Sequence, residues 1–265
     1  YEMNEINKTL YIPLYGKAKV SKMGIILNDK TAETIWDENA VSLGRKSKSK
    51  WLAYFMAMRA RVFDDWVRQM LSENSDAIVI HIGCGLDSRV SRIGPVNTMW
   101  YDMDFPEVIT ERKKFYAETA HYRMLSGNAA DPMWLTQIPA GKAAVIVMEG
   151  VSMYLTPKEL EGLFEMLEER FSSLCLLMDV YTGLGVNLTR FKNPIHEVGV
   201  TKTYGIDDPA VPLGTSGIRY VREHSMTPSE LVAELKGFEG FFFKTLFAGK
   251  FAKKLYRMHE YQYGY

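Results

Sequence analysis

Two glycines and one aspartate are spaced as they are in nucleotide-binding folds. Gly83 and Gly85 follow residues 77–82, an apolar run rich in β-branched side chains that is typical of a strand buried in a parallel sheet. Because glycine has no Cβ, the backbone here can turn sharply and lie close to a ligand. About twenty residues later a second strand-like run, residues 98–104, ends at Asp104, where such folds offer a carboxylate to ribose hydroxyls. The pattern predicts a site for an adenosine-containing cofactor.

The same glycine turn allows three other interpretations. A glycine turn after a strand also occurs in α/β proteins that bind no cofactor. An NAD-dependent dehydrogenase would continue the fingerprint to a third glycine, but Ser88 stands at that position. A non-catalytic protein would retain a nucleoside pocket without turnover. The sequence therefore favours an adenosine-containing ligand other than NAD and leaves these alternatives open.

Arg59 is a charged residue on the apolar side of a predicted helix. Between about residues 51 and 71, large apolar side chains recur with a helical period, and Arg59 falls inside their arc. An unpaired guanidinium buried there would cost several kcal/mol, so it needs an anionic partner. That partner is either a buried Asp or Glu of the protein or a carboxylate or phosphate of a ligand.

The composition gives no sign of a nucleic-acid or membrane partner. The 265 residues include 32 Lys plus Arg and 32 Asp plus Glu, so the formal net charge is zero. The longest apolar runs, residues 77–82 and 143–148, are far shorter than the roughly twenty residues of a membrane span, and no signal peptide is visible. The sequence leaves the oligomeric state open.

The cysteines and histidines are too few and too scattered for a disulfide framework or a zinc site. Cys84 and Cys175 both lie in or beside predicted core strands. A disulfide framework would need more than this one possible pair, so two free thiols in a reducing cytoplasm are the simpler interpretation. The 5 histidines show no zinc-type spacing with either cysteine. We therefore expect a cytoplasmic protein without a metal ion.

Runs typical of strands alternate with runs typical of helices along the chain. This alternation predicts a doubly wound, mainly parallel α/β sheet. Two strand-like runs near the C-terminus, residues 241–247 and 255–263, add a hairpin-like pair, which brings the expected sheet to seven strands, one of them antiparallel. The first five strands are expected at residues 77–82, 98–104, 122–126, 143–148 and 174–180.

Capping residues mark the starts of several predicted helices. Asp29 precedes a short helix, and Pro106 begins a helix that should reach about residue 120. Residues 44–50 contain four cations in seven residues and are expected to form an exposed loop. Capping boxes are expected at Thr156-Pro157-x-Glu159 and at Thr227-Pro228-x-Glu230, the second opening a helix to about residue 235.

A chain of this length is expected to form a single domain, residues 1–265. Residues 1–28 have no clear period and are expected to form an arm lying over the domain. Residues 181–225 mix scattered Gly and Pro with polar and aromatic residues, which is typical of a lid or binding insertion. The expected parts are an N-terminal arm with helices (1–72), a cofactor-binding core (73–180), a lid insertion (181–226) and a C-terminal helix with strands (227–265).

Four short motifs lie in order between residues 59 and 155, with a weaker fifth before them. They are Arg59-x-Arg61-x-x-Asp64-Asp65, His81-Ile82-Gly83-Cys84-Gly85-Leu86-Asp87-Ser88-Arg89, Trp100-Tyr101-Asp102-Met103-Asp104-Phe105-Pro106 and Glu149-Gly150-Val151-Ser152-Met153-Tyr154-Leu155, and before these Leu14-Tyr15-Gly16-Lys17. As a set they resemble the leucine carboxyl methyltransferase family, and within it the bacterial polyketide-type O-methyltransferases. The resemblance implies a class I S-adenosylmethionine-dependent methyltransferase with a Rossmann-like fold. The C-terminal third resembles the family only in general layout.

The resemblance also implies roles in binding S-adenosylmethionine. Arg59, helped by Lys17, would hold the methionine carboxylate. Asp104 would accept hydrogen bonds from the ribose hydroxyls, and Glu149 would lie near the methionine amino group or the acceptor. His81 stands where many methyltransferases of this fold have an acid, and the family often has Asp in place of Asn128. The remaining implied cofactor-binding residues are Gly83 and Gly85 at the methionine moiety, Asn128 and Ala129 at the adenine, and Phe105.

The reaction implied by the resemblance is methyl transfer to an oxygen of an acceptor, with Glu149 and Tyr154 as the catalytic candidates. A carboxylate acceptor is ionised at neutral pH and needs no base, whereas a hydroxyl needs one. No Ser/His/Asp or Cys/His nucleophile motif is present, so no covalent intermediate is expected. A small organic acceptor is expected, with a protein C-terminus as the alternative. The residues expected to contact it are Tyr154, Tyr181, Phe191, His196 and Tyr204.

Overall fold

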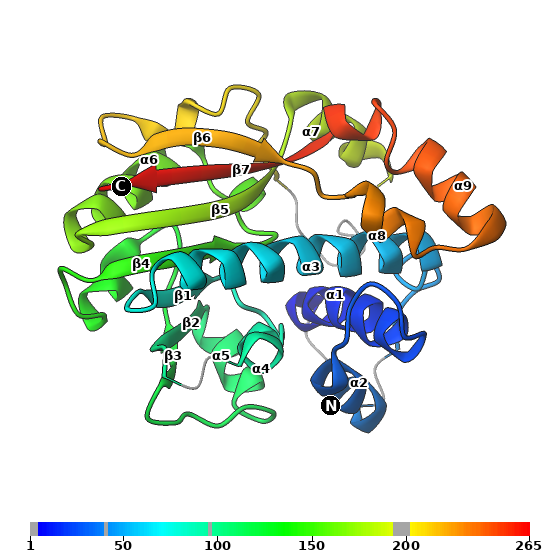
Figure 1. Ribbon diagram of the computed structural model, residues 1–265, viewed down its shortest axis with the longest axis horizontal. Coiled ribbons are helices and arrows are strands. Elements are labelled where there is room, and N and C mark those ends of the chain that lie inside the picture. Colours follow the sequence, from blue (N-terminus) through cyan, green and yellow to red (C-terminus); the bar gives the residue numbers. More distant parts are fainter. Residues whose placement is uncertain (1–4, 40–41, 95–96, 193–201) are drawn as a thin grey trace.

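The centre of the fold is a seven-stranded sheet (Figure 1). The structure, a computed structural model, describes residues 5–39, 42–94, 97–192 and 202–265. The strands are β1 (Ile78–Ile82), β2 (Trp100–Asp104), β3 (Tyr122–Ser126), β4 (Ala143–Met148), β5 (Ser173–Tyr181), β6 (Arg219–His224) and β7 (Tyr256–Tyr263). Their order is β3-β2-β1-β4-β5-β7-β6, and β7 runs antiparallel to both of its neighbours. The predicted doubly wound, mainly parallel sheet with one antiparallel strand is confirmed.

The strand order reverses beside β1. This strand pairs in parallel with β2 on one side and with β4 on the other, and all 5 of its residues are buried. The chain therefore builds β1, β2 and β3 outward in one direction and then returns to start β4 on the opposite side. In sheets of this kind, ligands bind beyond the carboxyl ends of the strands, at the point of reversal.

Helices cover both faces of the sheet. They are α1 (Glu5–Lys22), α2 (Lys30–Glu38), α3 (Lys50–Glu73), α4 (Arg89–Ile93), α5 (Pro106–Arg112), α6 (Pro157–Arg170), α7 (Gly183–Lys192), α8 (Ser229–Ala233) and α9 (Gly237–Leu246). The helix α3 runs across one face of the sheet with α1 beside it (Figure 1). Phe63 of α3 belongs to the same hydrophobic core as Val145 of β4. On the other face, Phe164 of α6 shares a second core with Ile146. Because successive strand residues point to opposite faces, one apolar run supplies both cores. Within the described residues, no helix has the length and apolar character needed to cross a membrane.

Two predicted helix starts carry the expected caps. The Thr156 hydroxyl accepts the Glu159 N–H at 3.2 Å while the Glu159 carboxylate accepts the Thr156 N–H at 2.7 Å, which confirms the capping box of α6. At the start of α2, Asp29 accepts the Ala32 N–H at 2.9 Å. Residues 44–50 form a mostly exposed turn, as predicted.

The predicted N-terminal arm is wrong, because residues 5–22 form the helix α1. Pro13 lies inside this helix and cannot donate the hydrogen bond of a helical residue. The buried side chains of Tyr11, Leu14 and Ala18 belong to the main core, and α1 packs against α3. Tertiary packing therefore stabilises a helix that the local sequence pattern does not predict.

The predicted strand at residues 241–247 is also wrong, because these residues lie largely in the helix α9 and its C-cap. Phe243 and Phe247 are four residues apart, as on one face of a helix, and both rings meet aromatic side chains of α3. Their partners are Tyr54, at 6.3 Å from Phe243, and Trp51, at 6.0 Å from Phe247. A phenylalanine-rich run suits a strand by composition, but contact with α3 favours the helix.

The seventh strand comes instead from the segment expected to be an irregular lid. That segment contains α7 and the edge strand β6, whose burial pattern is mostly exposed or intermediate. An exposed edge strand lacks the apolar run that reveals a buried one. Two predicted helices also differ: α5 ends at Arg112 rather than near residue 120, and α8 has Pro228 as its N-cap without a side-chain cap, so the capping box at Thr227 is wrong.

Candidate active site

A cavity of about 670 Å³ lies at the carboxyl edge of the sheet, beside β1. This volume falls in the range of small-molecule sites. The wall comes from α1 and α3 and from the turns that follow the first four strands. The lining residues fall within 10–17, 56–59, 81–87, 103–108, 127–130 and 149–155, with Tyr181 and Tyr256. All of the predicted cofactor-binding residues line it, namely Lys17, Arg59, Gly83, Gly85, Asp104, Phe105, Asn128, Ala129 and Glu149.

The glycine turn after β1 forms the floor of this cavity. Gly83 has φ +69° and Gly85 has φ +51°, in the left-handed region that favours glycine. A Cβ at Gly83 would overlap the Val151 side chain, which also lines the cavity. The Gly85 N–H donates to Asp104 Oδ2 at 2.8 Å, so the turn is tied to the end of the neighbouring strand.

Asp104 presents its carboxylate at the end of β2, where the sequence predicts ribose binding. Its Oδ1 accepts the Phe105 N–H at 2.8 Å, while Oδ2 accepts that of Gly85. Burial raises the pKa of Asp104 to about 6, and the two N–H groups partly oppose this shift. A carboxylate oxygen can accept a second hydrogen bond, so both oxygens can still receive a ribose hydroxyl.

The predicted adenine-binding residues lie in the turn after β3. Asn128 Oδ1 accepts the Ala130 N–H at 2.9 Å, which fixes the turn, and Ala129 is buried against the second core. Asn128 therefore has a structural task in the turn. Its amide NH₂ group is the part that can donate to a ligand.

Arg59 lies on the cavity wall and is paired with acids of the protein. Its Nε donates to Glu149 Oε1 at 2.9 Å, and its Nη1 donates to Asp179 Oδ2 at 3.1 Å and to the Tyr256 hydroxyl at 2.8 Å. Of the two kinds of partner that the sequence left open, the structure shows the buried protein carboxylates. A ligand carboxylate at this point would share the guanidinium with them.

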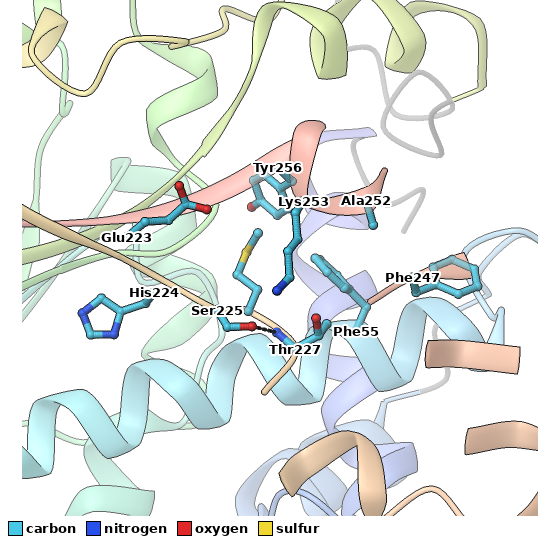
Figure 2. Close-up of a pocket in the computed structure, with 10 residues that line it drawn as sticks. Phe55, Glu223, His224, Ser225, Thr227, Phe247, Ala252, Lys253 and Tyr256 are labelled. Carbon is cyan, nitrogen blue, oxygen red and sulfur yellow. Dashed lines mark hydrogen bonds between the residues drawn. The ribbon is translucent and has the colours of Figure 1, made fainter. Parts of the chain in front are cut away.

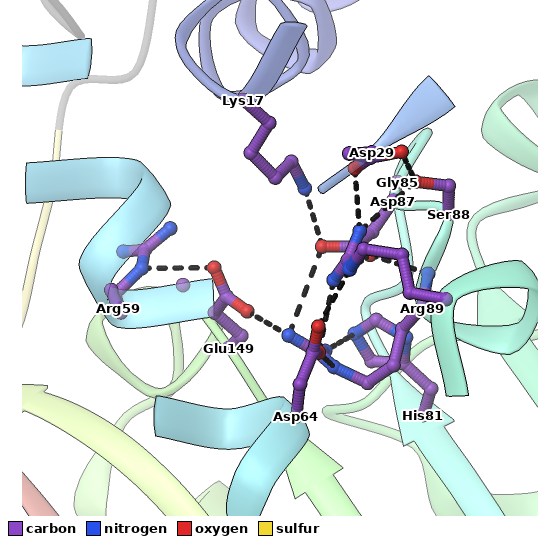
Figure 3. A network of polar contacts seen from close by, with 12 residues as sticks. Lys17, Asp29, Arg59, Asp64, His81, Gly85, Asp87, Ser88, Arg89 and Glu149 are labelled. Carbon is purple, nitrogen blue, oxygen red and sulfur yellow. Dashed lines mark hydrogen bonds and ion pairs between the residues drawn. The ribbon is translucent and has the colours of Figure 1, made fainter. Parts of the chain in front are cut away.

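Lys17 reaches from α1 toward the glycine turn and pairs with Asp87 (Figure 3). Both side chains are buried. The same carboxylate accepts the Arg89 backbone N–H at 2.7 Å. A ligand at Lys17 would therefore also meet the charge of Asp87.

Glu149 follows β4 and bridges two guanidinium groups. Its Oε1 accepts from Arg59, and its Oε2 accepts from Arg89 Nη2 at 2.5 Å. Burial alone would raise the pKa of Glu149, but the charges of Arg59 and Arg89 outweigh it and lower the pKa to about 2. Glu149 is therefore ionised at neutral pH and too weakly basic to remove a proton from a hydroxyl.

His81 stands in β1, directly before the glycine turn, and is buried. Its Nε2 lies 3.1 Å from Arg89 Nη1, and its Nδ1 has no hydrogen-bond partner. Burial, with the nearby charge of Arg89, lowers the pKa of His81 to about 4, so the ring is neutral at pH 7.

Several charged residues around the cavity were not predicted to act there. Arg89 pairs with Asp64 of α3 and with Glu149, as Figure 3 shows. Asp179, which lies in β5, pairs with Arg59. Asp64 and Arg89 occur inside the sequence motifs, but without an implied role. Asp179 was visible as a single acid within the apolar run of a predicted strand, which is a signal of a buried polar contact.

Tyrosines form the end of the cavity beyond Glu149. Tyr154, 38% exposed, and Tyr181 both line it, as the predicted acceptor contacts should. The Tyr181 ring lies 4.7 Å from that of Tyr256, which the sequence did not single out. Tyr204 does not line the cavity, although its N–H donates to the Met153 carbonyl at 2.8 Å. His196 and the side chain of Phe191 lie outside the described residues.

A second, smaller pocket also borders on Tyr256 (Figure 2). Its volume is about 260 Å³, and its walls come from α3, from the chain after β6 and from the segment before β7. Phe55 and Phe247 supply apolar walls, while Glu223 and Lys253 supply charges. Tyr256 lines both spaces, so a single side chain borders the two.

The described residues contain no group of three or more His, Cys, Asp or Glu placed to hold a metal ion. Cys84 and Cys175 are both free and buried. Burial raises the pKa of Cys175 to about 11, so this thiol is neutral at physiological pH.

The sheet order, the glycine turn after β1 and the acidic end of β2 define a Rossmann-like α/β fold with a nucleoside-binding edge. Solved structures share this fold. A DUF574-family protein from Streptomyces avermitilis matches with a TM-score of 0.59 at 12% identity, over 88% of this chain and 89% of that one. The N-methyltransferase NodS from Bradyrhizobium japonicum, in complex with S-adenosylhomocysteine, matches with a TM-score of 0.51 at 12% identity, over 88% and 98%.

Residues 13–168 match the model of the leucine carboxyl methyltransferase family, and the chain belongs to that family. It is an S-adenosylmethionine-dependent methyltransferase, as predicted. The chain is 27% identical over 237 residues to the tetracenomycin polyketide synthesis O-methyltransferase TcmP of Streptomyces glaucescens, covering 88% of each. It is 26% identical over 226 residues to the S-adenosyl-L-methionine-dependent methyltransferase dpfgK of Gibberella zeae, covering 76% of each.

Proposed function

We propose that this enzyme methylates a carboxyl oxygen of a small organic molecule, with a hydroxyl as the less favoured acceptor. The observation that carries the proposal is the state of the two catalytic candidates, Glu149 and Tyr154, which both line the cavity. Glu149 has its pKa lowered to about 2, and the pKa of Tyr154 is raised above its ordinary value because its hydroxyl is largely removed from solvent, although the side chain as a whole is 38% exposed. Since neither group removes a proton at neutral pH, an acceptor that is already ionised fits best.

The residues of the cavity fit S-adenosylmethionine. The floor at Gly83 has no room for a Cβ, Asp104 offers acceptors for hydroxyl groups, and the lining contains more carboxylates than cations. When bound, this cofactor supplies an electrophilic methyl group on a sulfonium. We assign Asp104 to the ribose, Asn128 and Ala129 to the adenine, Phe105 to the adenosine side of the cavity, and Arg59 with Lys17 to the methionine carboxylate.

The protein would contribute mainly orientation to the reaction. Methyl transfer requires the acceptor oxygen to approach in line with the bond that breaks, and correct positioning can lower such a barrier by ~7–11 kcal/mol at best. Tyr154, Tyr181 and Tyr256 supply rigid aromatic walls for an acceptor. Glu149 would then not act as a base. It would hold the Arg59 side chain in place and contribute a negative charge to the site.

The acceptor class is supported by the relatives. TcmP is named as an O-methyltransferase of polyketide synthesis, which is a small-molecule reaction. The apolar and aromatic lining suits an organic acid of similar character. We further propose that the chain acts as a single domain in the cytoplasm and needs no nucleic acid as partner.

Transfer of a tritiated methyl group from S-adenosylmethionine into a cell extract tests the proposal. Label should enter the small-molecule fraction and be released by mild base, as expected for a methyl ester. Label confined to protein would support a protein C-terminus as acceptor and overturn the proposal. Base-stable label on a small molecule would exclude a methyl ester and point to a hydroxyl acceptor.

Matched variants make this result specific to the cavity. Asp104→Asn should reduce the label strongly, because it removes the proposed ribose contact. Asp65→Asn changes an exposed carboxylate on α3 that pairs with Arg61 and Arg68 away from the cavity, and should leave the label unchanged. Tight binding of NAD without binding of S-adenosylhomocysteine would instead support a dehydrogenase.

A further inference from the structure

Nine buried charged side chains form one continuous chain of ion pairs beside the cofactor cavity (Figure 3 shows part of it). Each of these side chains is at most 7% exposed. The chain is branched, because Asp64 and Asp87 each pair with both Arg89 and Arg92. It reaches from β5 past the cavity to the start of α2. Its members are Asp179, Arg59, Glu149, Arg89, Asp64, Asp87, Arg92, Lys17 and Asp29.

The chain contains one carboxylate more than it contains cations. Four of its members are Lys or Arg and five are Asp or Glu, so its formal charge is one negative unit. His81 touches the chain but stays neutral, because burial lowers its pKa to about 4. Beyond His81, Asp102 is balanced by its own ion pair with Arg112. Neither contact changes the surplus.

The surplus lies at the cavity end of the chain. At the far end, Asp29 caps α2 and accepts the Ala32 N–H at 2.9 Å, so the positive end of that helix compensates its charge. At the near end, Arg59 is the only cation paired with Asp179 among the described residues, and Glu149 shares it while also accepting from Arg89. The other donors to Asp179, the Tyr256 hydroxyl and the Gly150 N–H, carry no formal charge. Burial raises the pKa of Asp179, as expected for a carboxylate whose charge is incompletely compensated.

The cavity wall shows the same excess of negative charge. Its lining includes the cations Lys17 and Arg59. Against these two stand four carboxylates, those of Asp87, Asp104, Glu107 and Glu149. A ligand that carries a net positive charge would therefore offset a charge that is costly to bury without a partner.

S-adenosylmethionine carries a sulfonium, an ammonium and a carboxylate, and hence one net positive charge. Its product, S-adenosylhomocysteine, has a neutral thioether and no net charge. We propose that the surplus carboxylate at Glu149 and Asp179 makes this site discriminate by charge, so that it binds the methyl donor more tightly than the demethylated product. Bound donor brings six positive and six negative groups together, whereas bound product leaves one negative charge unmatched. The site therefore promotes release of the product after each transfer.

The inference rests on the cofactor and not on the acceptor proposed above, so it is tested by binding alone. Calorimetric titration of the unaltered protein with S-adenosylmethionine, S-adenosylhomocysteine and sinefungin separates charge from shape. Sinefungin has a carbon in place of the sulfur and an ammonium group in place of the methyl, so it carries a positive charge close to that of the sulfonium and should resemble the donor. We expect both cationic ligands to bind at least tenfold more tightly than S-adenosylhomocysteine, a difference of ~1.4 kcal/mol. Equal or tighter binding of S-adenosylhomocysteine would overturn the proposal.

A substitution that removes the surplus charge gives the second test. Asp179→Asn should weaken binding of S-adenosylmethionine about tenfold and leave that of S-adenosylhomocysteine nearly unchanged, so that the ratio of the two affinities approaches one. Asp65→Asn removes a carboxylate that is 51% exposed and lies outside the chain of ion pairs, and should leave the ratio unaltered. A folded Asp179→Asn protein that keeps the original ratio would overturn the assignment to this end of the chain. If that variant does not fold, Glu149→Gln removes charge from the same end, and the ligand series decides independently.

Discussion

Replacement of Gly83 by alanine tests the geometry of the cavity floor. The backbone at Gly83 has φ +69°, which costs an L-residue about 1–2 kcal/mol. In addition, the new Cβ would overlap the Val151 side chain, so Val151 or the turn must move. Forcing extra volume into a packed site costs about 1–3 kcal/mol. Together these effects predict that Gly83→Ala lowers the free energy of unfolding by about 2–5 kcal/mol.

Gly24→Ala is the matched control for this prediction. Gly24 also has φ +69°, but a Cβ there would meet nothing within 4 Å. It should therefore lose only the backbone contribution of about 1–2 kcal/mol. Urea titration gives the free energy of unfolding of both variants, and the difference between their losses measures the cost of the overlap with Val151. Because Val151 lines the cavity, Gly83→Ala should also weaken binding of S-adenosylhomocysteine, whereas Gly24→Ala should not. Equal losses of stability and unchanged binding in both variants would refute the reasoning.

Three further predictions follow from the polar contacts. Arg59→Met should lower the free energy of unfolding of the ligand-free protein by about 3–5 kcal/mol in urea titration, because Glu149 and Asp179 lose a buried cation; unchanged stability would contradict these ion pairs. Affinity for S-adenosylhomocysteine should fall roughly tenfold from pH 7 to pH 5, because Asp104, whose pKa is raised to about 6, is protonated as the pH falls; calorimetry on Asp104→Asn should show no such fall. Thr156→Ala should cost about 1 kcal/mol of stability through the lost cap of α6, with unchanged ligand binding.

The central part of the fold could be predicted because its signals are local. The apolar run of β1, the glycines that follow it and the alternation of strands with helices are all visible within short windows of sequence. The cap at Thr156 depends only on residues within one turn. The errors lie where distant contacts decide. The helix α9 is set by aromatic contacts with α3, and α1 by burial against the same helix.

The cavity's lining was predicted better than its charge pairing. A resemblance in sequence motifs placed Arg59, Asp104 and Glu149 in one site, and the structure brings them to the same cavity. The partners of Arg59 could not be predicted, because Asp179 lies 120 residues away and reaches it only through the pairing of β4 with β5. The hydrophobic pattern indicated that Arg59 needs a negative partner, but only the three-dimensional structure identifies which one.

A crystal structure of the protein with S-adenosylhomocysteine tests the central assignment most directly. We expect the ligand to lie in the cavity at the carboxyl edge of β1 and β2, with its ribose hydroxyls within hydrogen-bonding distance of Asp104 and its methionine end beside Arg59 and Glu149. A ligand bound in the smaller pocket that also borders on Tyr256, or one whose ribose does not contact Asp104, would contradict this assignment.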